Sequence, residues 1–227
     1  MSAGPRWLYL HGFASSPASR KARAFVDWGN ERGIEIRALD LRAPSLEHLR
    51  FSQITRRVRD AIDAEGDRGR IVLIGSSLGG LTACRVAELE PRVAALFLMA
   101  PAFRLAERWR ARLGEEAFGR WHDTDALEVT DYATGKKTMV DHRFVTELGE
   151  LDVGWPDVRV PTCIVHGTED ETVDVALSRT WATGRRHVRL VEVTDGHELG
   201  ASIPRLLAEA TKFFAPFGVS GTDFSPA

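Results

Sequence analysis

The segment that most restricts the fold of this chain is a tight turn between an apolar run and a helix-like stretch. The turn reads Gly75-Ser76-Ser77-Leu78-Gly79, a G-x-S-x-G pattern, and it follows the apolar run Ile71–Ile74. Glycines flank the central serine because a Cβ two residues before or after it would strike the neighbouring strand or helix. The pattern therefore predicts a strand, a sharp turn and a helix, with the Ser77 hydroxyl exposed above a sheet. A plain Gly/Ser-rich turn is the alternative.

Short apolar runs alternate with longer helix-like segments along the chain. This alternation is typical of a parallel sheet with helices on both faces. The expected strands are Trp7–Leu10, Ile34–Leu39, Ile71–Ile74, Val93–Met99, Thr162–His166 and Val188–Val193. The expected helices are Ser19–Arg32, Ser52–Ala64, Leu78–Leu89, Val175–Thr183 and Ala201–Phe214, with Gly33, Gly66 and Gly184 at helix ends. The sequence thus predicts an α/β fold with a mostly parallel sheet of about six strands.

One interval, residues 103–159, interrupts this alternation and is too long for a simple crossover connection. We interpret it as a small inserted cap within a single domain that spans residues 1–227. Its expected elements are an amphipathic helix marked by Leu105, Trp109 and Leu113, a hairpin over Tyr132–Val140 around Gly135, and a helix over Asp141–Leu148. The alternative is that this segment only covers the sheet. The Gly/Ser/Pro-containing tail, residues 215–227, is expected to be flexible.

Composition excludes several classes of function. Charged residues make up 27% of the chain and the formal net charge is −2, so no broad basic surface attracts nucleic acid. Cys84 and Cys163 lie far apart in apolar stretches, which predicts two buried thiols. Met1–Leu10 reaches a strand without a signal-peptide core, and no apolar run approaches the ~20 residues that span a bilayer. We expect a cytoplasmic protein that does not bind membranes; its oligomeric state stays open.

Two further motifs supply partners for Ser77. His197 follows the last expected strand and Asp170 follows the penultimate one. A serine hydroxyl needs a base within hydrogen-bond reach and a third group that fixes the tautomer of that base. In a parallel sheet all three loops emerge at the carboxyl edge, and the order Ser, Asp, His is the triad order of the α/β-hydrolase architecture. The sequence predicts Ser77 as nucleophile, His197 as base and Asp170 as acid.

Other residues compete for these roles. Glu169, Glu171 and Asp174 lie in the same loop as Asp170, and any of them is an alternative acid. His11 and His166 end strands next to glycines, so we assign them structural hydrogen bonds to loop backbones.

Acyl transfer also requires donors for the developing oxyanion, each worth about 2.7–4 kcal/mol in comparable sites. Gly12 follows the first strand and lets the chain bend, so that the Phe13 N–H points toward Ser77. The second donor is the N–H of Leu78, the residue after the nucleophile, at a helix N-terminus. A simple strand-ending turn is the alternative for the segment around Phe13.

The chain resembles the α/β-hydrolase family, and within it the small bacterial YqiA-type esterases. The resemblance rests on residues 8–13, 15–17 and 21–22 of the opening segment, on the elbow at 75–80, on residues 132–135 of the cap, and on the loops at 170–173 and 196–197. It implies hydrolysis of short acyl esters, a small-molecule substrate, and no cofactor or metal. The prediction is a serine carboxylesterase that works through an acyl-enzyme; a thioesterase or peptidase with the same triad, or a non-catalytic binding protein, are the alternatives.

Overall fold

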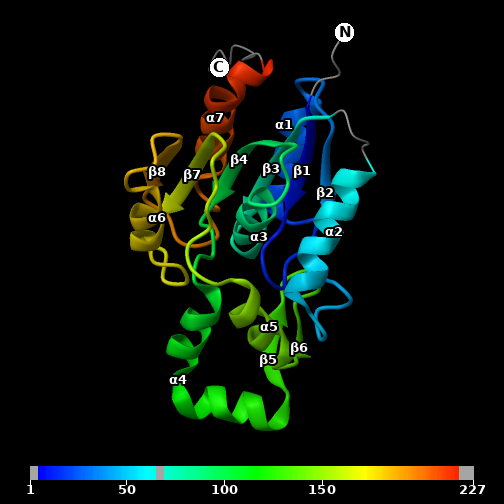
Figure 1. The fold of residues 1–227 in the computed structure, drawn as a ribbon, viewed down its shortest axis with the longest axis vertical. Coiled ribbons are helices and arrows are strands. Elements are labelled where there is room, and N and C mark those ends of the chain that lie inside the picture. Colours follow the sequence, from blue (N-terminus) through cyan, green and yellow to red (C-terminus); the bar gives the residue numbers. More distant parts are fainter. Residues whose placement is uncertain (1–4, 65–68, 220–227) are drawn as a thin grey trace.

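The structure, a computed structural model, describes residues 5–64 and 69–219. Its central feature is a six-stranded sheet with strand order β2-β1-β3-β4-β7-β8 (Figure 1). All of its strand pairings are parallel, which confirms the predicted sheet. The strands are β1 (Arg6–Leu10), β2 (Ile36–Leu39), β3 (Ile71–Ser76), β4 (Val93–Met99), β7 (Thr162–Gly167) and β8 (Val188–Val193).

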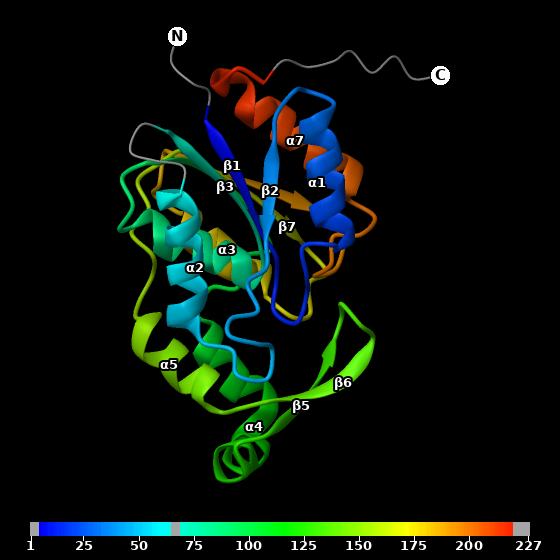
Figure 2. The same cartoon turned by 90° about the vertical axis from the view of Figure 1, so that its right-hand side faces the viewer.

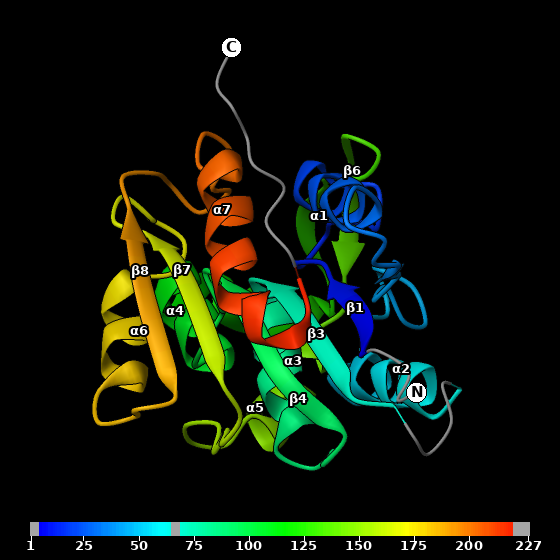
Figure 3. The same cartoon turned by 90° about the horizontal axis from the view of Figure 1, so that it is seen from above.

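Helices cover both faces of the sheet, as predicted. Figure 3 shows α1 (Arg20–Asn30) and α7 (Ile203–Phe214) on one side, and α2 (Phe51–Asp63) and α3 (Leu78–Ala87) on the other. Helix α6 (Val175–Ala182) packs beside β7 and β8 on the α2/α3 side. Gly33 and Gly184 adopt φ values of 67° and 76° just beyond α1 and α6, where glycine ends a helix without strain. Gly66, expected to end the second helix, lies outside the described residues.

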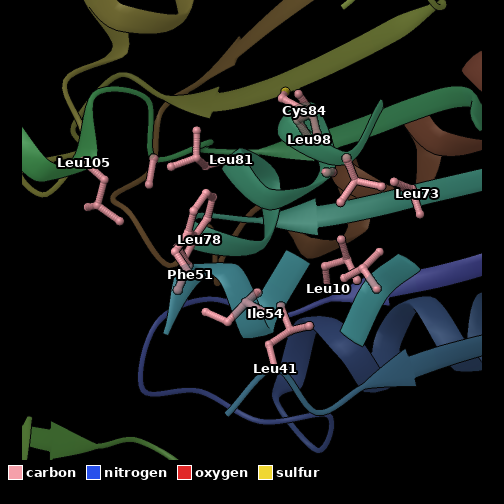
Figure 4. Packing of buried hydrophobic residues seen from close by; sticks show 14 of the residues in the cluster. Leu10, Leu41, Phe51, Ile54, Leu73, Leu78, Leu81, Cys84, Leu98 and Leu105 are labelled. Carbon is pink, nitrogen blue, oxygen red and sulfur yellow. The ribbon is translucent and has the colours of Figure 1, made fainter. Parts of the chain in front are cut away.

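The core consists of two apolar layers because strand side chains alternate between the faces of the sheet. On β3, Leu73 belongs to the layer under α2 and α3, whereas Val72 and Ile74 belong to the layer under α1 and α7. Figure 4 shows the first layer, in which Leu73 and Leu98 of neighbouring strands pack with Cys84 of α3. Cys84 and Cys163 are both buried and unbonded, as predicted.

The observed ends of these core elements differ from the predicted ones by up to two residues. Helix α1 begins at Arg20 because Ser19 serves as its N-cap, with Oγ accepting a hydrogen bond from the Ala22 N–H at 3.3 Å. Strand β3 continues to Ser76, so it ends directly at the turn that carries Ser77.

The segment between β4 and β7 forms a separate layer at the carboxyl edge of the sheet (Figure 2). It contains α4 (Leu105–Thr124), β5 (Leu127–Asp131), β6 (Lys136–Val140) and α5 (Arg143–Leu151). Helix α4 is kinked at Gly114, which has φ 74° and ψ 162°. We call this segment the cap.

The predicted bounds of two cap elements are wrong. The hairpin begins at Leu127 rather than Tyr132, because the Asp131 side chain builds the turn by accepting hydrogen bonds from the Ala133 N–H (2.9 Å) and the Thr134 hydroxyl (3.0 Å). The following helix runs from Arg143 to Leu151 rather than from about Asp141 to Leu148. Its predicted first residue, Asp141, is instead held by an ion pair with Arg50, at 2.6 Å.

The chain beyond α7 continues as a 3₁₀ turn, Ala215–Phe217, and Val219 is buried against the α1/α7 layer. The rest of the predicted flexible tail, residues 220–227, lies outside the described residues. No helix of the described chain combines the length and the apolar character needed to cross a bilayer.

The close packing of α3 against β1 predicts a large difference between two glycine substitutions. A methyl group at Gly79 would overlap the Leu10 carbonyl, whereas one at Gly119 of α4 would meet no atom within 4 Å. Gly79→Ala is expected to lower the free energy of unfolding by about 3 kcal/mol, and Gly119→Ala to raise it by up to ~1 kcal/mol through helix propensity. Urea unfolding measures both, and equal effects of the two substitutions would contradict the packing.

Candidate active site

The serine of the elbow stands at the carboxyl end of β3 in a strained backbone conformation. Ser77 has φ 54° and ψ −115°, a region that non-glycine residues rarely adopt. Backbone hydrogen bonds hold this geometry: the Ser77 N–H donates to the Met99 carbonyl at 2.9 Å, and the Ser77 carbonyl accepts from Gly80 and Leu81 of α3. The strained residue is thus fixed from β4 on one side and from α3 on the other.

The glycines of the motif have the steric role that the sequence predicts. A Cβ at Gly75 would lie 2.5 Å from the Gly79 carbonyl oxygen. At Gly12, in the loop after β1, a Cβ would lie 3.3 Å from the Ser77 Cβ. The loop after β1 therefore approaches Ser77 closely enough that only glycine fits without displacement.

The structure brings together the three side chains that the sequence predicts as a triad. The Ser77 Oγ lies 3.0 Å from His197 Nε2, and His197 Nδ1 lies 2.8 Å from Asp170 Oδ2. These are hydrogen-bond distances, and they join loops from three strands at one edge of the sheet. In this arrangement the Ser77 hydroxyl donates to the imidazole, and the imidazole donates to the carboxylate.

The Asp170 carboxylate is fully buried and fully partnered. Its Oδ1 accepts hydrogen bonds from the N–H groups of Thr172 (2.8 Å) and Val173 (2.7 Å), while Oδ2 faces His197 and His166. Burial raises the pKa of Asp170, but the hydrogen bonds from His166, His197 and Val173 outweigh burial and lower the pKa below its ordinary value. The group is therefore a carboxylate at neutral pH.

His166 also supports this carboxylate. Its Nε2 donates to the Val173 carbonyl at 2.8 Å and lies 3.2 Å from Asp170 Oδ2, while Nδ1 accepts from the Ser178 hydroxyl at 2.8 Å. Sequence analysis assigned His166 hydrogen bonds to the loop backbone, which the structure confirms, but it missed the contact with Asp170. The i, i+4 spacing of the two residues across the strand end was the available signal.

A close contact also joins the loops that carry Asp170 and His197. A Cβ at Gly167 would overlap the Asp195 carbonyl, and the Glu169 N–H donates to that same carbonyl at 3.1 Å. The Asp195 side chain accepts from the N–H groups of Gly196 (2.8 Å) and Ser202 (2.9 Å). His197 is thus held at a fixed place relative to Asp170.

The competing acids lie elsewhere. Glu169 and Glu171 are exposed to solvent. Asp174 caps α6, where its side chain accepts from the Ala176 N–H at 2.8 Å. Among the acidic residues of this loop, Asp170 alone contacts His197.

The two amides expected to form an oxyanion hole lie beside Ser77. Among the described residues, neither the Phe13 N–H nor the Leu78 N–H donates to a backbone carbonyl. The Phe13 ring packs against Trp109 of α4 (centroids 5.0 Å apart) and Phe144 of α5 (5.6 Å), so cap contacts position this loop. Both N–H groups remain available to a ligand.

The cap and the sheet edge enclose a cleft of about 960 Å³ that Ser77 and His197 line. Its apolar lining comes from the cap, through Trp109, Leu113 and Val129, and from Phe13 and Leu78 at the sheet edge. A second hollow, of about 460 Å³, lies at the opposite end of the strands and far from these groups. In the described part of the chain, no group of three or more His, Cys, Asp or Glu side chains is arranged to hold a metal ion.

Comparison with known proteins gives a family and a fold. The model of uncharacterised protein family UPF0227 matches residues 6–215. The chain belongs to this family. A comparison of this chain with curated proteins gave no match.

Solved structures with the same fold are α/β hydrolases, which confirms the predicted fold class. Alpha/beta hydrolase domain-containing protein 10 from mouse superposes with a TM-score of 0.78 at 19% identity, covering 95% of this chain and 92% of that one. Est1E from Butyrivibrio proteoclasticus, solved with ferulic acid, gives 0.80 at 21% identity, with coverages of 97% and 92%. The esterase PF2001 from Pyrococcus furiosus gives 0.62 at 17%, with coverages of 95% and 82%.

The hydrogen bonds of His166 predict a pH-dependent loss of stability. Because the folded pKa of Asp170 is lowered, its carboxylate stabilises the fold fully above the ordinary unfolded value of about 3.9, and this contribution is lost as the pH falls toward the folded pKa. His166→Ala removes one of the bonds that lower that pKa and leaves the buried Ser178 hydroxyl without its acceptor. The substitution is expected to lower the free energy of unfolding by about 2–3 kcal/mol at pH 7 and by less at pH 3.

Urea unfolding at the two pH values measures this difference. His122→Ala serves as the control, since the His122 ring is 70% exposed, lies far from Asp170 in sequence, and contacts the Asp123 carboxylate and the edge of the His142 ring. A His166→Ala cost that does not change with pH would contradict the coupling to Asp170.

Proposed function

We propose that the protein is a serine hydrolase that cleaves short carboxylic esters through an acyl-enzyme. The observation that carries this proposal is the continuous hydrogen-bonded line from Ser77 Oγ through His197 to Asp170, with distances of 3.0 and 2.8 Å. A line of this kind turns a weakly nucleophilic hydroxyl into an effective one, because the imidazole takes the proton as the oxygen attacks.

Each residue then has a defined step. Ser77 Oγ attacks the ester carbonyl while His197 Nε2 accepts its proton, and Asp170 stabilises the imidazolium and holds its tautomer. The Phe13 and Leu78 N–H groups donate to the oxygen that becomes negative. His197 returns the proton to the departing alcohol, and a water molecule, activated by the same imidazole, releases the acid from Ser77.

The named activities of structural neighbours support this choice of reaction. PF2001 is described as an esterase, and Est1E was solved with a carboxylic acid, ferulic acid, bound. Their identity to this chain is 21% or less, so they support the class of chemistry and not the substrate. A thioester or a peptide bond would react with the same groups, and parallel assays of matched oxyester, thioester and amide substrates rank the three.

Replacing the nucleophile is the direct test of this proposal. Ser77→Ala is expected to lower kcat/KM for p-nitrophenyl butyrate at least about a thousandfold, because the remaining groups cannot form the acyl-enzyme. The neighbouring Ser76→Ala is the matched control, since it removes a hydroxyl from the same turn without touching the proposed nucleophile. Wild-type rates in a folded Ser77→Ala protein would rule out the assignment.

A further inference from the structure

The charges that line the cleft beside Ser77 are unequal. Two lining residues are acidic, Glu128 and Glu198. Six are basic, and they come from α1, α4 and β6: Arg20, Lys21, Arg23, Arg108, Arg112 and Lys137. Six minus two leaves an excess of four positive charges. Since the whole chain has a formal net charge of −2, this excess is a local property of the cleft.

The two carboxylates of the cleft are already paired with its lysines. Glu198 Oε2 lies 3.7 Å from Lys21 Nζ, and Glu128 Oε1 lies 3.3 Å from Lys137 Nζ. The four arginines that remain, Arg20, Arg23, Arg108 and Arg112, form no ion pair with a carboxylate of the described chain. Carboxylates of the described chain therefore leave the charge of these four arginines unpaired.

Arg108 is the cleft arginine that contacts the loop carrying Asp170. It projects from α4, and its Nη2 donates to the carbonyl of Thr172, two residues from Asp170. Its Nη1 is buried and has no hydrogen-bond partner among the described residues. An unsatisfied guanidinium N–H is costly in the interior of a protein, so a ligand acceptor that hydrogen-bonds Nη1 would remove that cost. A planar guanidinium matches the oxygens of a carboxylate or a phosphate.

The arginines stand on two walls of the cleft that the chain brings together from distant segments. Arg20 and Arg23 lie on α1, next to the sheet, while Arg108 and Arg112 lie on α4 of the cap. Between them the cap contributes the apolar side chains of Trp109 and Leu113. A ligand that fits both features has an apolar part and a negative charge.

We propose that the cleft selects esters that carry an anionic group, a carboxylate or a phosphate, and that Arg108 and Arg112 are specificity-determining residues for that group. This inference rests on the proposed ester hydrolysis and names the substrate class of the same site. The positive field also raises the local concentration of such esters at the mouth of the cleft.

Matched pairs of esters test this selectivity. The first pair is p-nitrophenyl valerate and mono-p-nitrophenyl glutarate, which place the charge on the acyl part. The second pair is the acetyl esters of methyl 4-hydroxybenzoate and of 4-hydroxybenzoate, which place it on the leaving group. In at least one pair the anionic ester is expected to have a kcat/KM about tenfold higher, the equivalent of one charge-assisted hydrogen bond.

Substitutions of the cleft arginines test whether these residues cause the preference for anionic esters. Arg108→Gln and Arg112→Gln are expected to bring the anionic-to-neutral ratio of kcat/KM down toward one. Arg110→Gln is the matched control, since Arg110 lies on the same helix, pairs with Glu115 and does not line the cleft. Arg108→Gln removes a hydrogen bond to the Thr172 carbonyl, and this loss could impair folding. Arg112 is exposed, so Arg112→Gln is expected to fold and tests the proposal in that case.

The outcomes separate this inference from the proposed function. Equal rates for both members of each pair, abolished by Ser77→Ala and unchanged in ratio by the arginine variants, would overturn the inference and leave the esterase proposal intact. If no ester is hydrolysed, calorimetric titration of the wild-type protein with glutarate, inorganic phosphate and neutral glutaramide tests whether the cleft binds anions. Binding of glutarate or phosphate that Arg112→Gln weakens supports the anion site, and no binding of either refutes it.

Discussion

The elbow at Ser77 is the constraint on which the rest of the site depends. Its φ of 54° is unfavourable for serine, and it persists because hydrogen bonds from β4 and α3 fix the backbone around it. The close approach of Gly79 to the Leu10 carbonyl lets α3 begin directly against β1. Without that approach the helix would start further from the sheet, and the hydroxyl would no longer meet His197 at 3.0 Å.

A second contact sets the positions of Asp170 and His197 relative to each other. Gly167 and the Asp195 carbonyl touch where β7 and β8 end, so the two loops behave as one unit. His166 contacts the Asp170 carboxylate from the core side, and the Ser178 hydroxyl holds the His166 ring in place by a hydrogen bond. The result is a carboxylate that stays ionised although it is buried, which is the state needed to stabilise a protonated imidazole.

Sequence reasoning predicted the parallel sheet, the helices on both of its faces, and the meeting of three side chains, Ser77, Asp170 and His197, at one edge of that sheet. It succeeded there because strand ends in a parallel sheet share one edge, so loops far apart in sequence converge by topology alone. It missed the contact of His166 with Asp170, which depends on how the loop after β7 folds back on its own strand. It also missed the contact of Arg108 with the Thr172 carbonyl, because the path of the cap over the sheet follows from tertiary packing, including that of Trp109 on Phe13.

The most direct measurement of the central claim is reaction of the protein with a fluorophosphonate, followed by mass mapping of the modified peptide. Such a reagent phosphonylates a serine only where a neighbouring base and oxyanion donors activate it. The geometry predicts a single adduct on Ser77, and a sharp loss of labelling when His197 is replaced by alanine. Labelling of a different serine, or labelling of Ser77 that does not depend on His197, would contradict the account.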